Sequence, residues 1–512
     1  MKEKPKFSPD QLKASNPAEN IWVQANAGTG KTKALIQRLL RILFRSNQYG
    51  ELNKTGVLCL TYTNAAAGEM RNRILAGLRE WSMVNDNELK ELLEYVVENQ
   101  NVTDKDLELA RKVFYVYIDN PDMLKIKTIH SFCEEILHRF PLEAGIAPTW
   151  SLVSGSAQTV LLDEAFNRMI SHSDANSTTS DAFYRIVDNK SEYFLDDLRK
   201  LLLERYRYFF QVDNIDEYRK YFIGTTKKIL NIEKEFDVEY KPDYLSKILN
   251  WAIDIKNSTK KPAQYIEKII DLTQKYIENT INFEKYSSAY LTKDNSIIKH
   301  VESQEFLLPE AQRVYETKQY FLNKDIFDNT LALFNLSMDF ANVYRQIKQE
   351  YNLLDFEDLI LYTQKLFEKP DVMGWVLSQL DISLSHILVD EAQDTSPQQW
   401  NILRMLAGDF FTDGTNANNR SLFVVGDTKQ SIYGFQNADP RAFALSRDAI
   451  GEQIKQNYRT IHEIPLDQSF RSVEPILKTV DYCKSFLEYL WVFNLQFYLW
   501  LKHLRLTTVP AV

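Results

Sequence analysis

The amino-acid sequence predicts an α/β protein whose parallel sheet is interrupted by a large all-helical insertion. Residues 20–140 alternate between short apolar runs rich in β-forming residues and helix-like stretches, an order typical of parallel strands covered by helices. Residues 156–373 contain a single glycine, Gly224, and long amphipathic stretches, which predict helices. Strand-like sequence returns after residue 385. The sheet is therefore expected to be built from two separated parts of the chain.

The first part of the sheet begins with the run IWVQA at 21–25, and a second strand is expected in GVLCLTYT at 56–63. Helical periodicity follows each strand, in KTKALIQRLLRILF at 31–44 and in AAAGEMRNRILAGLREW at 65–81. This order of strand, helix, strand and helix predicts neighbouring parallel strands with helices packed on them.

The insertion is expected to be helical at 244–257 and at 327–351, with a polar loop at 171–181. Two further strands are predicted after the insertion, in HILVDEAQD at 386–394 and in SLFVVGDTKQ at 421–430. In both, an apolar run ends in polar residues. These strands are expected to complete the sheet that the N-terminal part begins.

The composition is that of an ordinary globular protein, with 44% hydrophobic and 26% charged residues. The three cysteines, Cys59, Cys133 and Cys483, are odd in number and lack the spacing of a metal site, so a disulfide scaffold is not expected. The N-terminus has no apolar signal-peptide core. We therefore expect a cytoplasmic protein with no membrane partner and no zinc or iron–sulfur site.

Charge is distributed unevenly along the chain. The formal net charge of −9 argues weakly against a nucleic-acid partner. Residues 1–80, however, hold 13 Lys and Arg against 6 Asp and Glu, a net charge of +7. A local basic surface can bind phosphates on a chain that is acidic overall, and a solvated basic helix face is the alternative.

The segment ANAGTGKT, from Ala25 to Thr32, matches the phosphate-binding pattern G-x-x-x-x-G-K-[ST], with alanine in place of the first glycine. Gly28 and Gly30 would let backbone N–H groups approach phosphates. Lys31 would contact the β- and γ-phosphates of ATP, and the Thr32 hydroxyl would coordinate Mg²⁺. The dipole of the following helix favours the same anion. The predicted ATP-binding residues of this segment are Ala25, Asn26, Ala27, Gly28, Thr29, Gly30, Lys31 and Thr32.

Two adjacent carboxylates, Asp390 and Glu391, end the predicted strand in ILVDEAQD. Adjacent residues at a strand end project to opposite sides, so one can hold Mg²⁺ while the other polarises a water for attack on the γ-phosphate. We assign Asp390 to the metal and Glu391 to the water. A solvated acidic pair is the alternative. The carboxylates of LLDFEDLI at 353–360 are instead expected to cap a helix or to make contacts between domains.

Five segments occur in the order found in UvrD/Rep-like superfamily 1 DNA helicases: ANAGTGKT, VLCLTYTNAAAGEM, ILVDEAQDTSPQQW, VVGDTKQSIYGFQNADP and LDQSFRS. The resemblance covers residues 8–155 and 350–481. TIHSFCEEILHRFPLEAG and QLKASNPAENIWVQANAGTGKT resemble AddA, the helicase–nuclease subunit of bacterial double-strand-break repair. The resemblance implies a first RecA-like P-loop NTPase domain in two parts, residues 1–150 and 351–447. It also implies a helical insertion domain at 151–350 and the start of a second RecA-like motor domain at 448–512.

The resemblance also implies roles for single residues. Gln11 corresponds to the residue that holds the adenine edge, Gln430 to the residue that senses the γ-phosphate, and Arg471 to an arginine that reaches this phosphate from the second motor domain. Tyr62 and Phe435 correspond to aromatics that stack on the bases of single-stranded DNA. Motifs that contact the DNA backbone contain Thr61, Thr63, Thr128 and His130. A structural role is the alternative for each, and for His130 it has equal weight.

In function, the chain resembles an ATP-dependent 3′-to-5′ helicase motor that binds single-stranded or tailed duplex DNA during double-strand-break repair and recombination. An AddB-like subunit is a partner that the resemblance allows, although the sequence gives no direct sign of it. One alternative is a truncated remnant that binds ATP and DNA without unwinding. A second, an unrelated P-loop ATPase or kinase, would explain the phosphate loop but not GDTKQSIYGFQNADP or SFRS.

The C-terminal segment departs from the resemblance. Eight aromatic residues fall between 482 and 500, and Glu488 is the one charged residue from Phe486 to Leu501. This composition predicts neither an ordinary surface helix nor a full membrane span. We expect the tail from about residue 482 to be foreign to the family, as in a truncated or frameshifted chain. Such a chain is expected to bind ATP, with little DNA-stimulated ATPase and no unwinding or nuclease activity.

Overall fold

A computed structural model of the chain describes residues 7–48, 56–97, 101–171, 178–187, 192–205, 215–233, 242–258, 264–379, 384–412, 420–431, 439–457, 459–480 and 482–483. Phe435 and the aromatic tail from residue 484 therefore lie outside the described residues. Contacts divide the chain into two units. Unit 1 combines Met1–Leu152 with Leu354–Val512, and unit 2 is Val153–Leu353.

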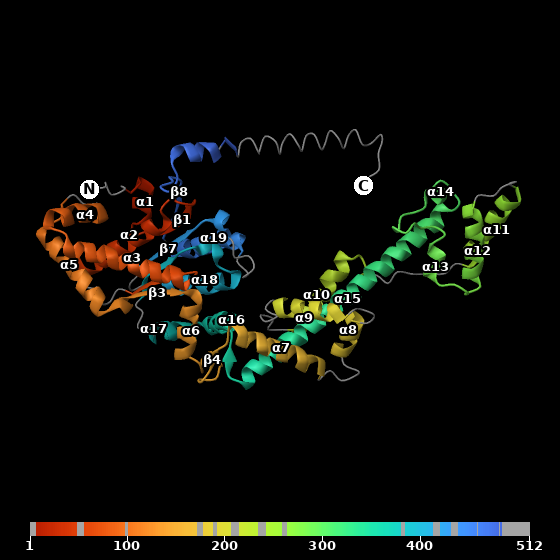
Figure 1. The fold of residues 1–512 in the computed structure, drawn as a ribbon, viewed down its shortest axis with the longest axis horizontal. Helices are drawn as coiled ribbons and strands as arrows, with labels where there is room; N and C mark the ends of the chain where they lie inside the picture. The colour runs from red at the N-terminus through yellow and green to blue at the C-terminus, as the bar shows by residue number, and fades with distance from the viewer. Residues whose placement is uncertain are drawn as a thin grey trace. The chain divides into compact units, whose positions relative to one another are not determined.

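Unit 1 is built around a parallel sheet, which confirms the predicted α/β class. Six strands of the described chain form it, in the order β3-β2-β6-β7-β1-β8. Figure 1 labels β3, β7, β1 and β8 of this sheet. Every neighbouring pair is parallel. The strands are β1 (Asn20–Ala25), β2 (Gly56–Thr61), β3 (Leu124–Thr128), β6 (Leu384–Val389), β7 (Ser421–Gly426) and β8 (Ile461–Leu466).

Helices cover both faces of this sheet because its strands are apolar on both sides. In β1, Trp22 packs into one core, whereas Ile21 and Val23 pack into the other. The Trp22 core is covered by α6 (Ile129–Arg139), α16 (Phe356–Phe367), α17 (Pro370–Gln379), α18 (Pro397–Thr412) and α19 (Pro440–Gln456). The opposite core is covered by α2 (Lys31–Gln48), α3 (Asn64–Met83), α4 (Asp86–Val97) and α5 (Asp104–Asp119).

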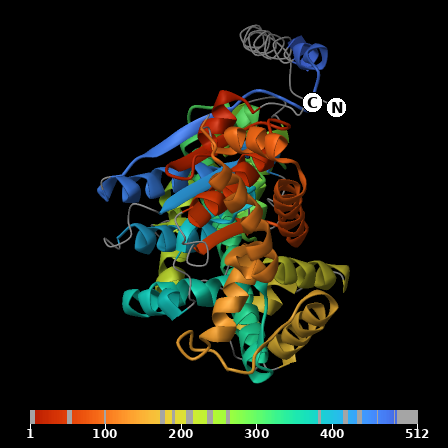
Figure 2. The same cartoon turned by 90° about the vertical axis from the view of Figure 1, so that its left-hand side faces the viewer.

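One strand lies in a part of the chain that the sequence assigned to a second motor domain. β8 pairs in parallel with β1 along its whole length, from Asn20 opposite Ile461 to Ala25 opposite Leu466. It is an edge strand of the described sheet, and Figure 2 shows the same fold turned by 90°. Ile464 and Leu466 add to the core beneath β1. The backbone hydrogen bonds and this burial hold β8 in the first sheet, so residues 461–466 belong to that sheet.

Unit 2 is helical, as Figure 1 shows, and its longest helix, α15 (Leu308–Glu350), has 43 residues. Between β4 (Ser151–Leu152) and β5 (Leu353–Leu354) the described elements are α7 (Gly155–Ser171), α8 (Thr178–Val187), α9 (Glu192–Arg205), α10 (Ile215–Ile229), α11 (Pro242–Ser258), α12 (Gln264–Ile277), α13 (Phe283–Ser287), α14 (Lys299–Glu302) and α15. Among the described residues, no helix combines the length and apolar character required to cross a membrane.

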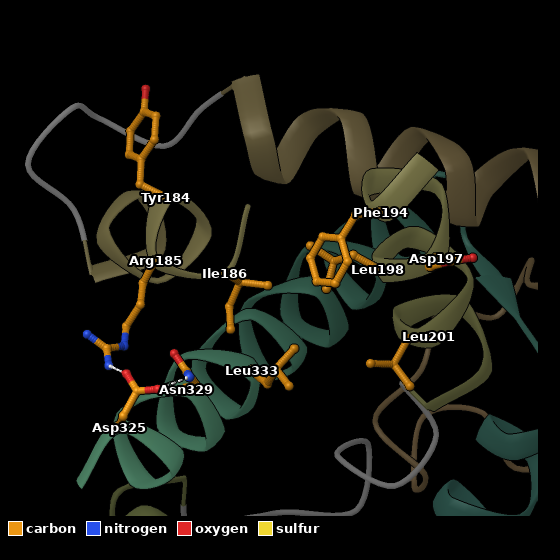
Figure 3. Close-up of a pocket in the computed structure, with 10 residues that line it drawn as sticks. All are labelled: Tyr184, Arg185, Ile186, Phe194, Asp197, Leu198, Leu201, Asp325, Asn329 and Leu333. Atoms are coloured by element: carbon orange, nitrogen blue, oxygen red, sulfur yellow. Dashed lines mark hydrogen bonds and ion pairs between the residues drawn. The ribbon is translucent and has the colours of Figure 1, made fainter. Parts of the chain in front are cut away.

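Unit 2 contains a pocket of about 930 Å³ between α8, α9 and α15 (Figure 3). An Arg185–Asp325 ion pair of 2.9 Å lies at its edge. None of the described residues predicted to bind nucleotide or DNA lines it. The lining residues are Tyr184, Arg185, Ile186, Phe194, Asp197, Leu198, Leu201, Asp325, Asn329 and Leu333.

Candidate nucleotide-binding site

The carboxyl ends of the parallel strands gather most of the predicted site residues at one edge of the sheet. The register places Gln24 opposite Gly426, at the ends of β1 and β7. It also places Thr61 opposite Thr128, at the ends of β2 and β3. Ligands of open α/β sheets bind at this edge, beyond the strand ends. The predicted phosphate loop, the paired carboxylates and the Gln430 segment all follow directly from strands that end there.

The phosphate loop connects β1 to α2, which begins at Lys31. Gly28 and Gly30 adopt positive φ angles of 76° and 84°, a conformation that favours glycine. Thr29 Oγ1 donates to the Asn26 carbonyl at 2.8 Å and closes the turn. The sequence therefore forms the predicted strand, glycine-containing loop and helix N-terminus, the arrangement that suits an anion.

Both glycines are approached closely by other segments. A Cβ at Gly28 would lie 2.6 Å from the Cβ of Arg471, and the Phe470 N–H donates to the Gly28 carbonyl at 2.9 Å. A Cβ at Gly30 would collide with Nε2 of Gln11. The structure thus brings Arg471 and Gln11, which are far apart in the sequence, against the same loop.

Gln11 is fully buried and its amide is held at both ends. Nε2 donates to the Thr29 carbonyl at 2.7 Å, and Oε1 accepts from the Ser8 N–H at 3.1 Å. Ser8 and Gln11 form the capping box of α1 (Pro9–Ala14). The residue predicted to hold the adenine edge therefore also anchors α1 to the phosphate loop.

Lys31 and the paired carboxylates lie together. Lys31 Nζ is 3.3 Å from Glu391 Oε2. Asp390 follows β6 directly and is buried, and its N–H donates to the Leu60 carbonyl at 2.9 Å. Burial, and next to it the charge of Glu391, raises the pKa of Asp390 to about 7, against the opposing effects of the Glu391 N–H, Lys31 and Arg73. The site therefore contains a buried carboxyl that is costly to ionise beside a partly exposed one.

Glu391 has a left-handed backbone, with φ 48° and ψ 42°, and a buried glutamine holds its side chain. Gln393 Nε2 donates to Glu391 Oε2 at 2.8 Å, and Gln393 Oε1 accepts from the Asp427 N–H at 2.8 Å. Asp427 in turn accepts from the side chain of Gln430. Sequence reasoning missed Gln393, and its one sequence signal was a glutamine two positions after the paired carboxylates.

The residues predicted to contact DNA at β2 have local structural contacts as well. Thr61 is buried, and its hydroxyl donates to the Thr63 carbonyl at 3.1 Å. Thr63 caps α3 by accepting from the Ala66 N–H at 3.1 Å. Tyr62 is half-buried between them. All three lie at the carboxyl end of β2, on the same end of the sheet as the phosphate loop.

At the end of β3, Thr128 caps α6 and its hydroxyl donates to Ser131 Oγ at 2.9 Å. The ring of His130 packs edge-on against Phe356, with 5.3 Å between the ring centroids. Burial lowers the pKa of His130 to about 4, so this imidazole is neutral at pH 7. Any contact it makes with DNA would therefore be a hydrogen bond or packing contact without a positive charge.

The sequence matches the family model described as the UvrD/REP helicase N-terminal domain over residues 7–450. It is also similar to three curated relatives that carry the name of an ATP-dependent helicase/nuclease component. The relative from Listeria welshimeri is 26% identical and covers 93% of this chain, which matches 39% of the relative. Those from Natranaerobius thermophilus and Enterococcus faecalis are 25% and 26% identical and cover 91% and 90% of the chain, which matches 36% of each.

This chain thus spans roughly two fifths of the length of the curated relatives that it matches. The family match, in contrast, extends across both parts of the sheet and across unit 2. It includes the phosphate loop, the paired carboxylates and Gln393, which the structure brings together at the strand ends. The chain belongs to the UvrD/REP helicase family.

Proposed function

We propose that the chain is the ATP-binding, single-stranded-DNA-binding motor domain of a 3′-to-5′ helicase of the UvrD/AddA type, acting in double-strand-break repair and recombination. The observation that carries this proposal is the meeting of Lys31 and Glu391, 360 residues apart in sequence and 3.3 Å apart in space, at the mouth of a glycine-containing loop. A lysine for phosphates and a carboxylate for water are the two groups that ATP hydrolysis requires at one place.

The residues present fit ATP with Mg²⁺. The loop from Asn26 to Gly30 is followed directly by the N-terminus of α2, where backbone N–H groups and the helix dipole favour phosphate. Thr32, half-buried in the first turn of α2, and Asp390 would supply hard oxygen ligands to the metal. The raised pKa of Asp390 marks a carboxyl whose ionisation a divalent cation would favour. When bound, the metal would neutralise charge on the phosphates.

The other residues would position the nucleotide and polarise the attacking water. Lys31 would hold the β- and γ-phosphates, and Glu391 would orient a water and accept its proton. Gln430 and Arg471 would contact the γ-phosphate, which is consistent with the place of Arg471 against Gly28. Gln11, already hydrogen-bonded to the loop, would hold the adenine edge.

Single-stranded or tailed duplex DNA is the proposed polymer substrate, with Tyr62 stacking on a base and Thr61, Thr63, Thr128 and His130 near the backbone. Phe435 is retained in this proposal from the family resemblance. The relatives carry the words helicase and nuclease in their names, and an AddB-like subunit is proposed as a partner of the whole protein. We place the protein in the cytoplasm on the basis of its composition.

The test is a set of measurements on the purified 512-residue chain. ATP binding is measured by titration with a fluorescent ATP analogue, and hydrolysis is measured with and without single-stranded DNA. Strand displacement is then compared on duplexes with a 3′ or a 5′ tail. ATP binding that requires Lys31, together with DNA binding, supports the motor assignment. A folded wild-type chain that binds no ATP would overturn it.

A further inference from the structure

We propose that Gln393 is a positioning residue that couples the water-activating carboxylate Glu391 to the γ-phosphate-sensing segment Asp427–Gln430, so that both respond together to the third phosphate of ATP. This inference rests on the proposed function and adds a residue to it. Gln393 lies in the short 3₁₀ turn Ala392–Asp394 that follows β6 and is 2% exposed.

On the β6 side, the Gln393 amide group holds carboxylates. Nε2 donates to Glu391 Oε2 at 2.8 Å and to Asp394 Oδ2 at 3.2 Å. Glu391 Oε2 is the same oxygen that lies 3.3 Å from Lys31 Nζ. One carboxylate oxygen is therefore shared by the phosphate-loop lysine and by Gln393. If a γ-phosphate draws Lys31 away from this oxygen, the Gln393 amide remains hydrogen-bonded to it, so a shift of the carboxylate acts directly on Gln393.

On the β7 side, the same amide holds the end of the neighbouring strand. Gln393 Oε1 accepts from the Asp427 N–H at 2.8 Å. Asp427 Oδ1 accepts from the Lys429 N–H at 3.0 Å, and the Asp427 carboxylate also accepts from the Gln430 side chain. A single hydrogen-bonded path therefore runs from Glu391 through Gln393 and Asp427 to Gln430.

The fit around Gln393 leaves little room for an alternative position. A Cβ added at Gly426 would lie 2.9 Å from Gln393 Oε1 and 3.1 Å from its backbone nitrogen. The same Cβ would also lie 2.9 Å from Cε2 of the Phe443 ring. Glycine at this point lets the ends of β6 and β7 approach closely enough for the amide to bridge them. A buried amide with its donor and acceptor both used fixes the relative position of the two strand ends.

The consequence is a coupling between two sensors of one phosphate. When Lys31 leaves Glu391 to bind phosphate, Glu391 moves, and the hydrogen bond between Glu391 and the Gln393 amide changes in length and direction. Because the same amide holds Asp427, that change is transmitted to the turn that carries Gln430. Removing Gln393 should weaken recognition of the third phosphate while the contacts to the first two, made by the phosphate loop, remain.

The experiment is a double-mutant cycle on the full 512-residue chain with Gln393→Leu, Gln430→Ala and the combination. Dissociation constants are measured for ADP and for the slowly hydrolysed analogue ATPγS, both with Mg²⁺. Each single change is expected to lower the ADP-to-ATPγS ratio of dissociation constants about tenfold, the effect of losing one buried polar contact. ADP affinity is expected to stay within about twofold. In the double variant the ratio should fall no further than in either single variant.

Gln399→Leu is the matched control, because Gln399 is also a buried glutamine, 6% exposed, whose Oε1 accepts from the Ser396 N–H at 3.1 Å to cap α18. It should leave the ratio unchanged. Gln393→Met, which keeps the length of the side chain, replaces Gln393→Leu if thermal melting shows that the latter is unfolded.

Three results would overturn the proposal: a ratio that Gln393→Leu leaves unchanged, an equal loss of ADP and ATPγS affinity, or fully additive effects of the two changes. A wild-type chain that binds neither nucleotide would instead overturn the proposed function itself, so the two failures are distinguishable.

Discussion

Lys31 Nζ lies 3.3 Å from Glu391 Oε2, so the lysine of the phosphate loop is paired with the carboxylate proposed to activate water. The Lys31 side chain is 9% exposed and that of Glu391 is 35% exposed, so the Glu391 side chain is partly accessible to solvent. A γ-phosphate would compete with Glu391 for the same ammonium group. We therefore expect ATP binding to break this ion pair and to free the Glu391 carboxylate for its work on water.

Lys31→Ala should raise the ATP dissociation constant at least about tenfold, because a charge-assisted contact to phosphate is lost. The matched control is Lys127→Ala, which removes another partly buried Lys–Glu pair of the same unit, Lys127–Glu135 at 2.7 Å. Nucleotide titration of both variants, with thermal melting to verify folding, checks the expectation. The melting curve matters because Lys31 is more buried than a typical surface lysine. Unchanged ATP affinity in folded Lys31→Ala would mean that the loop does not bind phosphate through Lys31.

Glu391→Gln keeps the size of the side chain and removes the base. ATP binding should be retained, whereas turnover should fall at least about a hundredfold, the usual size of a general-base effect. A single-turnover hydrolysis assay, beside nucleotide titration, separates the two quantities. Glu135→Gln, which removes the carboxylate of the Lys127 pair, serves as the control and should hydrolyse ATP at the wild-type rate. Equal turnover in Glu391→Gln and wild type would exclude Glu391 from this role.

The parts of the fold that could be predicted from the sequence are those with a local cause. β1, the loop with Gly28 and Gly30, and α2 follow one another directly, and each has its own pattern of residues. The carboxylates at 353–360 were expected to serve in capping or domain contacts. Asp355 and Asp358 indeed form the capping box of α16, with each backbone N–H donating to the other side chain at 2.9 and 3.0 Å. Such an arrangement spans four consecutive residues and is visible in any short stretch of sequence.

The parts that could not be predicted depend on distant partners. β3 and β8 are the edge strands of the described sheet, so each is paired on one side only, and neither has the continuous apolar run of β7. β8 even contains Pro465, which an edge strand tolerates. Gln393 acquires its role from Asp427, 34 positions later, through a hydrogen bond that no local pattern encodes. Pairing across the sheet decides these features.

The stability of the chain should fall in mild acid because of His386. Its Nδ1 lies 2.7 Å from Ser421 Oγ, which also accepts from Arg38 at 2.9 Å. Burial, and after it the charges of Arg38 and Arg45, lowers the pKa of His386 from 6.5 to about 3. Below pH 6.5 His386 therefore becomes protonated in the unfolded chain but stays neutral in the folded chain, and the free energy of unfolding decreases. Above pH 6.5 this contribution to stability is fully present.

The expected loss approaches about 1.4 kcal/mol for each pH unit below the unfolded pKa, per histidine of this kind. Urea unfolding at several values between pH 5 and 7.5 measures it. His386→Asn should make the dependence shallower. Burial also lowers the pKa of His130, which adds to the loss of stability in acid, whereas the raised pKa of Asp390 opposes that loss because the folded chain binds this proton more readily than the unfolded chain. His462→Asn, at a histidine whose side chain is 41% exposed, is the control and should retain the wild-type slope. A His386→Asn variant with the wild-type slope would contradict this account.

DNA binding should depend on Tyr62 and on salt, but little on base identity. Stacking of a base on a tyrosine contributes about 1–3 kcal/mol and needs only the face of the ring, so Tyr62→Ala should weaken binding of dT and dA oligonucleotides alike, by about fivefold or more. Binding should also weaken as salt rises, because Lys and Arg of the basic N-terminal region would displace counterions from the phosphates. Fluorescence anisotropy at several salt concentrations measures both effects. The control is Tyr115→Ala. This tyrosine is 61% exposed and lies within the helix α5, whereas Tyr62 directly follows a strand. Equal loss of affinity in both variants would contradict the proposed DNA path along the end of the sheet that holds Tyr62 and the phosphate loop. Binding that depends neither on salt nor on Tyr62 would contradict it as well.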